Sequence, residues 1–323
     1  MRSAPQWARQ DGFGIRVEWG RAGAAVLGPG AGCLVVIDVL SFTTSVSVAT
    51  AAGTAVFPYR WRDDSARAFA EENGAELAVG RRESGPWSLS PAAIRRAPFT
   101  PRLVLPSPNG STIAAAVEGT PVVAACLRNI SAVADWLVAR HWGTPDQPIV
   151  IIPAGEHWPG TDTVRPALED WLGAGALAAA LIDRGLTAPS PEARTAATVF
   201  DGTSDVGGLI TDCASGRELT AMGFADDVAI AIEQDADATV PVLTDNAFVD
   251  YPTEGDTVVG GGGVVGPHNQ TRGKSGKGKQ PKHHPHQNTP NHDTKNPPPA
   301  APPPPPPHTP PPPPTDRSTG SSR

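Results

Sequence analysis

Short apolar runs alternate with longer segments of helical spacing over the first 250 or so residues. The clearest run covers residues 33–37, carries no charge and is rich in β-branched side chains. Such a run is typical of a strand buried on both faces of a parallel sheet. Other strands are predicted at residues 14–20, 55–58, 76–80, 103–106, 121–125, 147–152 and 240–243.

The segments between these runs favour helices, with one exception. Residues 20–32 are rich in glycine and are predicted to be a loop. Helices are predicted after residue 38 and over residues 63–73, 131–140, 163–184, 191–200, 205–214 and 223–233. The alternation predicts an α/β protein, a three-layer α/β/α fold with a largely parallel or mixed central sheet.

Composition divides the chain into three parts. Residues 1–12 are polar and are expected to form a flexible N-terminus, and residues 13–251 form the predicted α/β domain. Residues 252–323 are rich in Gly, Lys, His and Pro, with very few apolar side chains, which predicts a disordered tail. Its proline run has polyproline II character, so a partner domain of the SH3 or WW type is one hypothesis for this tail.

Charge and hydropathy exclude several classes of protein. A formal net charge of −7 argues against a nucleic-acid partner, since nucleic-acid-binding proteins are usually basic. No apolar run is long enough for a membrane span, and the N-terminus lacks a signal-peptide pattern. The three cysteines are far apart and are interpreted as reduced core thiols. We therefore expect a cytoplasmic protein with no membrane partner, and the sequence leaves a homo-oligomer open.

One carboxylate, Asp38, follows the most apolar strand and precedes the hydroxyl-rich start of a helix. Ligands of open α/β sheets bind at the carboxyl ends of the strands. A buried carboxylate is costly unless it is paired, hydrogen-bonded or bound to a metal. Asp38 is therefore predicted to be a Mg²⁺ ligand or a nucleophile, and a helix cap is the structural alternative.

A second candidate segment, residues 107–112, joins a predicted strand to a helix. Gly110 lets the chain turn after Asn109, so that successive backbone N–H groups can face an oxyanion. The hydroxyls of Ser111 and Thr112 add further donors. An ordinary turn with a helix cap explains the same spacing, and the sequence does not separate these two interpretations.

Five more polar residues complete the predicted site. Arg128 offers a planar fork for phosphate or sulfonate, and Asn129 can bind a ligand or cap the next helix. Glu169 and Asp170 lie in an otherwise small and apolar helical segment, so one of them can face the site. Arg82 lies in a charged loop that is either an anion-binding loop or part of a surface salt bridge.

Known phosphate-binding and phosphatase motifs are missing. There is no Walker motif, no CxxxxxR loop, and the DxDx[TV] pattern fails because Leu40 stands where the second Asp would be. Histidine is almost absent from the candidate loops, which disfavours a Ser-His-Asp hydrolase. A Mg²⁺ site with carboxylates, hydroxyls and Arg suits phosphoryl chemistry, in which positioning and charge neutralisation dominate.

In this order, the candidate segments resemble the 2-phosphosulfolactate phosphatase (ComB-like) family over residues 14–245. The matching segments are residues 36–44, 108–111, 128–134 and 168–176. The resemblance implies an α/β/α fold and Mg²⁺-dependent hydrolysis of 2-phospho-3-sulfolactate to 3-sulfolactate and phosphate, a step of coenzyme M biosynthesis. It implies an acidic, metal-centred site around Asp38 and the Asn109 loop. Our hypothesis takes Asp38 and Asp170 as the catalytic residues, and Glu169 or Asp170 either completes the metal shell around Asp38 or positions water.

The chain departs from this family at three places. Ser41 stands where the family usually has Arg. Residues 80–83 read Gly-Arg-Arg-Glu where the family commonly has Gly-Glu-Arg, and residues 89–91 read Leu-Ser-Pro where it has Gly-Asn-Ser-Pro. Arg81 or Arg82 can offset the missing cation; otherwise the substrate differs or activity is lost. The alternatives are thus a small-anion-binding protein without catalysis, and an interaction protein that acts through its proline-rich tail.

Overall fold

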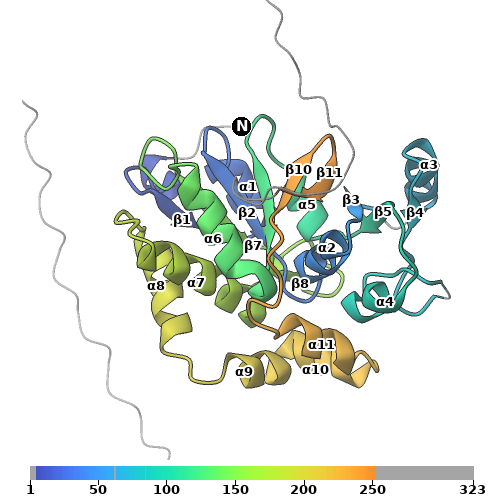
Figure 1. Cartoon of the computed structure of the whole chain (residues 1–323). Coiled ribbons are helices and arrows are strands. Elements are labelled where there is room, and N and C mark those ends of the chain that lie inside the picture. Colours follow the sequence, from blue (N-terminus) through green and yellow to red (C-terminus); the bar gives the residue numbers. More distant parts are fainter. Residues whose placement is uncertain (1–4, 62, 84, 252–323) are drawn as a thin grey trace, which may run out of the picture. The chain divides into compact units, whose positions relative to one another are not determined.

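The structure is a computed structural model that describes residues 5–61, 63–83 and 85–251 (Figure 1). All of them belong to one unit, Met1–Gly260. The tail predicted over residues 252–323 lies outside the described residues. None of the described helices is both long and apolar enough to cross a membrane.

The centre of the described unit is a mixed sheet with the strand order β1-β7-β2-β6-β10-β11-β3-β5-β4. Two groups of parallel strands, β1-β7-β2-β6 and β3-β5-β4, are joined by the antiparallel hairpin β10–β11. A separate hairpin, β8–β9, follows β7. The strands are β1 (Ile15–Val17), β2 (Cys33–Ile37), β3 (Ala55–Tyr59), β4 (Glu76–Leu77), β5 (Arg102–Pro106), β6 (Val122–Ala125), β7 (Ile149–Pro153), β8 (Glu156–His157), β9 (Val164–Arg165), β10 (Pro241–Thr244) and β11 (Ala247–Asp250).

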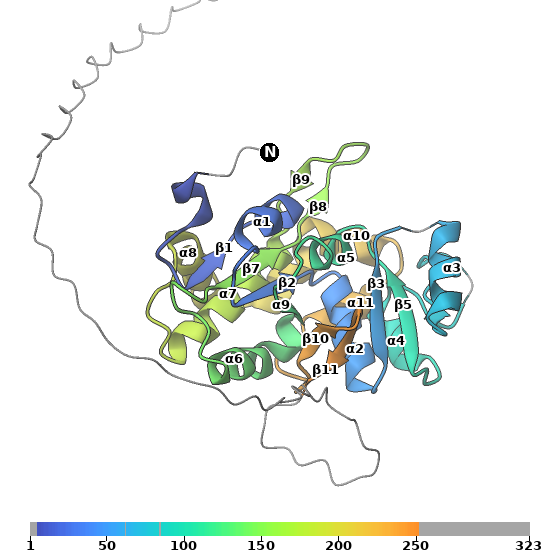
Figure 2. The same cartoon turned by 90° about the horizontal axis from the view of Figure 1, so that it is seen from above.

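Helices cover both faces of this sheet, which confirms the predicted three-layer α/β/α fold (Figure 2). They are α1 (Gly20–Leu27), α2 (Phe42–Ala51), α3 (Asp64–Glu72), α4 (Pro91–Arg96), α5 (Gly110–Ala114), α6 (Ile130–Ala139), α7 (Leu168–Asp183), α8 (Pro191–Asp201), α9 (Val206–Asp212), α10 (Ala214–Ala221) and α11 (Ala225–Ala231). Short 3₁₀ helices cover Gln6–Arg9 (η1) and Leu127–Asn129 (η2).

Strand β2 is buried on both faces, as its uncharged sequence predicts. Its residues Val35 and Ile37 pack into one cluster with α6 and α7, whereas Leu34 and Val36 pack into another with α1, α2 and α5. The alternation follows from the two-residue period of a strand. The end of β2, where Asp38 follows, is therefore held from both sides.

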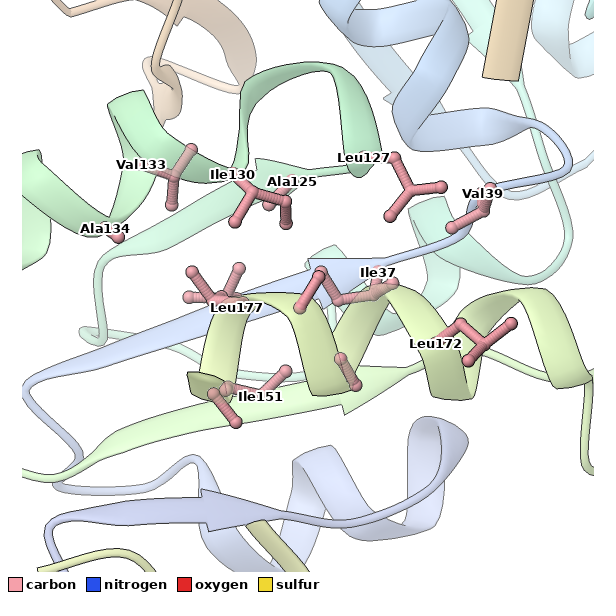
Figure 3. Close-up of a cluster of buried hydrophobic side chains, with 14 of the residues drawn as sticks. Ile37, Val39, Ala125, Leu127, Ile130, Val133, Ala134, Ile151, Leu172 and Leu177 are labelled. Atoms are coloured by element: carbon pink, nitrogen blue, oxygen red, sulfur yellow. The ribbon is translucent and has the colours of Figure 1, made fainter. Parts of the chain in front are cut away.

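Helix α7 lies very close to β2. A side chain at Gly173 would come within 2.8 Å of Ile37 and 3.0 Å of Val39, so only glycine allows this approach. Figure 3 shows Leu172 and Leu177 of α7 beside Ile37 and Ile151 of the sheet. Truncating Leu177 to Ala would cost about 2–5 kcal/mol of stability. The close packing brings the first turn of α7 to the end of β2.

Several predicted elements differ from the structure. Residues 20–27 form helix α1 rather than a loop, because Ala24 and Leu27 bury an apolar stripe against the sheet. The helix predicted from residue 163 begins at residue 168, and the residues before it pair in the β8–β9 hairpin. In the segment expected to be flexible, η1 forms and the buried Gln10 side chain bonds to Val17.

Candidate active site

Asp38 is buried directly after β2, with only 6% of its surface exposed. One carboxylate oxygen accepts the backbone N–H of Phe42 at 3.0 Å, and the other accepts that of Gly110 at 3.1 Å. A side chain at Gly110 would collide with the Phe42 ring and approach the carboxylate to 2.9 Å. The two N–H groups, one from α2 and one from the start of α5, thus fix the orientation of Asp38.

Asp170, in the first turn of α7, links the two strand ends on either side of the site. Its oxygens accept the backbone N–H groups of Val39 and Gly155, each at 2.8 Å. Val39 follows Asp38 in the chain, and Gly155 precedes Glu156. The neighbouring Glu169 is also buried and accepts the thiol of Cys213 at 3.2 Å. Both predicted acidic residues of α7 therefore lie behind the site.

Glu156 is a second carboxylate close to Asp38. It begins the β8–β9 hairpin just after β7, which pairs with β2 in parallel. The amide nitrogen of Asn109 donates to Glu156 at 3.0 Å, and the amide oxygen of Asn109 lies 2.9 Å from Nδ1 of His157. Asn109 thus orients Glu156, and its amide group is already hydrogen-bonded within the protein.

These residues surround a cavity of about 230 Å³. Its volume suits a small molecule rather than a nucleotide-sized ligand, because ligand pockets usually span about 300–1,000 Å³. The lining is polar and contains both carboxylates and an arginine. It consists of Asp38, Leu40, Ser41, Arg81, Leu89, Ser107, Pro108, Asn109, Glu156, Ser215, Glu218, Leu219 and Met222.

Burial and nearby charges raise the pKa of three carboxyl groups at the site. Burial raises the pKa of Asp38 to about 6, and the charge of Glu169 adds to this effect. The two N–H groups that Asp38 accepts act in the opposite direction. Burial and the charges of Asp38 and Glu169 raise the pKa of Glu156 to about 7. Burial and the same neighbours hold the pKa of Asp170 well above its usual range. A cation among these groups would relieve the repulsion between them.

The donor set fits a hard divalent cation with few protein ligands. In the described part of the chain, no three His, Cys, Asp or Glu side chains are grouped to hold a metal ion. Mg²⁺ usually keeps several waters and binds through one or two carboxylates together with substrate phosphate oxygens. Asp38 and Glu156 line the cavity and would supply those two carboxylates, whereas Glu169 and Asp170 are outside its lining.

The structure separates the residues predicted around the Asn109 turn. Asn109 lines the cavity, but Gly110 donates its N–H to Asp38. The Ser111 hydroxyl donates to the carbonyl oxygen of Tyr59 at 2.8 Å, so it holds α5 against β3. Thr112 is not among the cavity-lining residues. Most of this segment therefore shapes the site instead of contacting a ligand.

Arg128 and Asn129 do not join the other predicted residues. Arg128 forms an ion pair with Glu233 and lines a different hollow, beside the end of α2. The Asn129 side chain accepts the N–H of Cys126 at 2.9 Å and donates to the carbonyl of Thr239 at 3.1 Å. Strand β6 does run parallel to β2. However, Glu233 and Thr239 of the segment after α11 bind the side chains of Arg128 and Asn129.

Of the two arginines in the loop after β4, Arg81 lines the cavity and Arg82 does not. Arg82 is exposed in a neighbouring hollow that also involves Arg81 and Met222. An Nη nitrogen of Arg81 donates to the hydroxyl of Ser41. The guanidinium group at the cavity thus belongs to Arg81, in the loop after β4, and it lies next to Ser41, which follows β2.

Sequence reasoning missed Glu156 and the contributions of α10. Glu156 had a detectable signal, because it follows a strand end that is parallel to β2 and adjacent to it. Ser215 and Glu218 had none, since they lie in a helix 177 or more residues after Asp38 with no motif of their own. Only the three-dimensional structure brings α10 to the cavity.

The protein has a three-layer α/β/α fold with a mixed sheet, and a small, carboxylate-rich cavity lies at the end of one of its central strands. This arrangement is typical of α/β proteins that bind small molecules. The family model described as 2-phosphosulpholactate phosphatase matches residues 28–246 of the chain. The chain therefore belongs to the 2-phosphosulpholactate phosphatase family. The match includes every residue that lines the cavity.

Two curated relatives carry the corresponding name. The chain is 27% identical over 222 residues to a "Probable 2-phosphosulfolactate phosphatase" of Thermotoga petrophila. It is 25% identical over 222 residues to a protein of the same name from Thermotoga maritima. Each alignment covers 67% of this chain and 90% of the relative. The shared region is therefore nearly the whole relative.

Proposed function

We propose that this chain hydrolyses the phosphate monoester of a small, doubly anionic acid, and that 2-phospho-3-sulfolactate is the first substrate to test. Membership of the family and the names of the relatives support this chemistry. The observation that carries the proposal is the shared cavity of Asp38, Glu156 and Arg81, which offers carboxylates for a cation and a cation for an anion.

We propose Mg²⁺ as the cofactor, held by Asp38 and Glu156. When bound, it would neutralise charge that develops on the phosphoryl oxygens. The raised pKa values of both carboxyl groups support a cation here, because the charged forms are unfavourable without one. This assignment replaces the two predicted metal carboxylates of α7, Glu169 and Asp170, with Glu156 of the β8–β9 hairpin.

The protein's own residues would then orient the reactants. The N–H groups of Phe42 and Gly110 fix Asp38, and Asn109 fixes Glu156. Asp170 holds the backbone that carries both carboxylates. In the reaction, water attacks phosphorus and the ester P–O bond breaks. The oxygen of the leaving group gains a proton, so that the acid is released with a free hydroxyl group. Residues held before binding lower the cost of positioning.

Release of inorganic phosphate tests this proposal. Wild-type protein is incubated with 2-phospho-3-sulfolactate and with a panel of small phosphomonoesters, in Mg²⁺ and in EDTA. We expect Mg²⁺-dependent release, fastest with a substrate that carries two anionic groups in addition to its phosphate. Binding of 3-sulfolactate without release from any phosphoester would instead assign the cavity to a non-catalytic anion-binding protein.

A further inference from the structure

The cavity contains an uneven set of charges. Of the described residues that line it, Asp38, Glu156 and Glu218 are acidic, and Arg81 is the one basic residue. Two of the acids are already assigned to a cation by the proposed function. A substrate with a second anionic group needs another positive partner, because a buried anion is costly without one. Arg81 is the residue available for this purpose.

Arg81 is held by three contacts, one with the residue before α2 and two with the start of α11. Its Nε donates to Asp227 of α11 at 3.2 Å, and an Nη donates to the Ser41 hydroxyl. Its guanidinium carbon lies 5.8 Å from the centre of the Phe224 ring. Among the described residues, these acceptors use two of the five N–H groups of the guanidinium, so three remain for a ligand.

Asp227 is the unusual member of this arrangement. It is 1% exposed and does not line the cavity. Its Oδ1 accepts the Ser90 hydroxyl at 2.5 Å and the Ala92 N–H at 3.1 Å, and its Oδ2 accepts only Arg81 among the described residues. A buried carboxylate pays a large desolvation cost that a well-placed cation offsets. Asp227 thus ties the Arg81 fork to α4 and α11.

We propose that Arg81 is the specificity-determining residue that binds the second anionic group of the substrate, a carboxylate or sulfonate, and that Asp227 is a positioning residue that acts through Arg81. This inference rests on the proposed function for the identity of the substrate. Planar guanidinium groups pair with two oxygens of such anions, which a point charge does not match. The substrate class is therefore a phosphomonoester with a second acid group a few bonds from the phosphate.

A ratio of two substrates separates recognition from structure. The kcat/KM for 2-phospho-3-sulfolactate is divided by that for isopropyl phosphate, which has no second anionic group. Arg81→Gln should lower this ratio by about 10–100-fold, the loss expected for a charge-assisted hydrogen-bonding pair, mostly through KM. Activity on isopropyl phosphate should fall less than activity on 2-phospho-3-sulfolactate, because isopropyl phosphate lacks the second anionic group that Arg81 would bind.

Asp227→Asn is designed to break a single contact. The Asn oxygen can still accept the Ala92 N–H and the Ser90 hydroxyl, whereas its NH₂ group would face Arg81 and cannot accept from it. The ratio should fall in the same direction as in Arg81→Gln. The matched control is Asp226→Asn, the neighbouring exposed residue, which pairs with Arg96 at the surface and should leave the ratio unchanged.

The double variant tests whether Asp227 acts through Arg81. Arg81→Gln with Asp227→Asn should show the same ratio as Arg81→Gln, because the positioning residue has nothing left to position. This comparison also remains usable if Asp227→Asn does not fold, since removing both partners of a buried pair is tolerated better than removing one. A further loss in the double variant would overturn the assignment of Asp227.

Binding of 3-sulfolactate, measured by calorimetry, distinguishes failure of this inference from failure of the proposed function. If wild type does not turn over any phosphoester but binds 3-sulfolactate in a way that depends on Arg81 and Asp227, the inference stands and the phosphatase assignment falls. If Arg81→Gln binds 3-sulfolactate like wild type, or loses activity equally on both substrates, the inference is overturned.

Discussion

The carboxylate of Asp170 accepts the backbone N–H of Val39 at 2.8 Å, across 131 residues of sequence. Its other oxygen holds Gly155, so one side chain ties together the backbone on which Asp38 and Glu156 stand. Gly173, one turn further along α7, allows the helix to come close enough for these bonds. The sequence reasoning placed Asp170 at the site, and the structure shows it behind the site, as a support.

Replacing Asp170 should therefore affect stability as well as activity. Asp170→Ala would leave two buried N–H groups without an acceptor, at about 1–3 kcal/mol each. We expect the free energy of unfolding in urea to fall by about 2–5 kcal/mol. The control is Asp183→Ala, at the exposed end of the same helix, which should change stability by less than about 0.5 kcal/mol. Equal stability of both variants would remove the supporting role of Asp170.

Metal-free protein should lose stability as the pH rises. The pKa of Asp38 is raised to about 6 in the folded state from 3.8, so the folded protein holds this proton more tightly than the unfolded chain. The resulting stabilisation is present below about pH 4 and is lost as the pH rises through about 6. Glu156 acts in the same direction at slightly higher pH.

The variant Asp38→Asn isolates this effect, because it cannot titrate. In EDTA, the free energy of unfolding of Asp38→Asn relative to wild type should increase by up to about 3 kcal/mol between about pH 4 and about pH 7. Urea denaturation at several pH values measures the difference. A difference that does not change with pH would contradict the raised pKa.

Mg²⁺ should stabilise the folded protein through Asp38 and Glu156. At ten times its Kd, a ligand adds about 1.4 kcal/mol, which raises Tm by roughly 3–6 °C for a domain of this size. Glu156→Gln and Asp38→Asn should each lose most of the rise, whereas Asp183→Asn should keep it. The prediction fails if the rise persists in Asp38→Asn, since the cation would then bind elsewhere.

The strand pattern predicted much of the sheet and the position of Asp38. A charge-free run such as residues 33–37 has few alternatives to a buried strand, and the helix packed behind it was visible as a small-residue segment. The hairpin β10–β11 was harder, because Ala247–Asp250 has a short, mixed pattern and pairs in the middle of the sheet. Helix α1 was missed because the four glycines in residues 20–30 outweigh its apolar stripe when the segment is considered without its tertiary contacts.

The site was less predictable than the fold. Strand ends are visible in sequence, but the direction in which each loop leaves is set by tertiary contacts. Arg128 follows a strand adjacent to β2, yet its side chain forms an ion pair with Glu233 and lines a different hollow, beside the end of α2. Asp227 had no motif at all, and its importance comes only from its contact with Arg81.

Arg128→Gln tests this difference between adjacency in the sheet and placement in the cavity. The variant should be less stable, by about 1–3 kcal/mol, because it leaves Glu233 with one arginine fewer. Its KM for 2-phospho-3-sulfolactate should stay within about twofold of wild type, in contrast to Arg81→Gln. A tenfold rise in KM with unchanged kcat would instead place Arg128 in substrate binding.

The most direct test of the central claim is the rate of phosphate release from 2-phospho-3-sulfolactate by Asp38→Asn at saturating Mg²⁺. If the cavity at the end of β2 is the active site, the rate falls by at least about 100-fold while Asp183→Asn keeps the wild-type rate. Phosphate release by folded Asp38→Asn at the wild-type rate would show that the reaction takes place somewhere else.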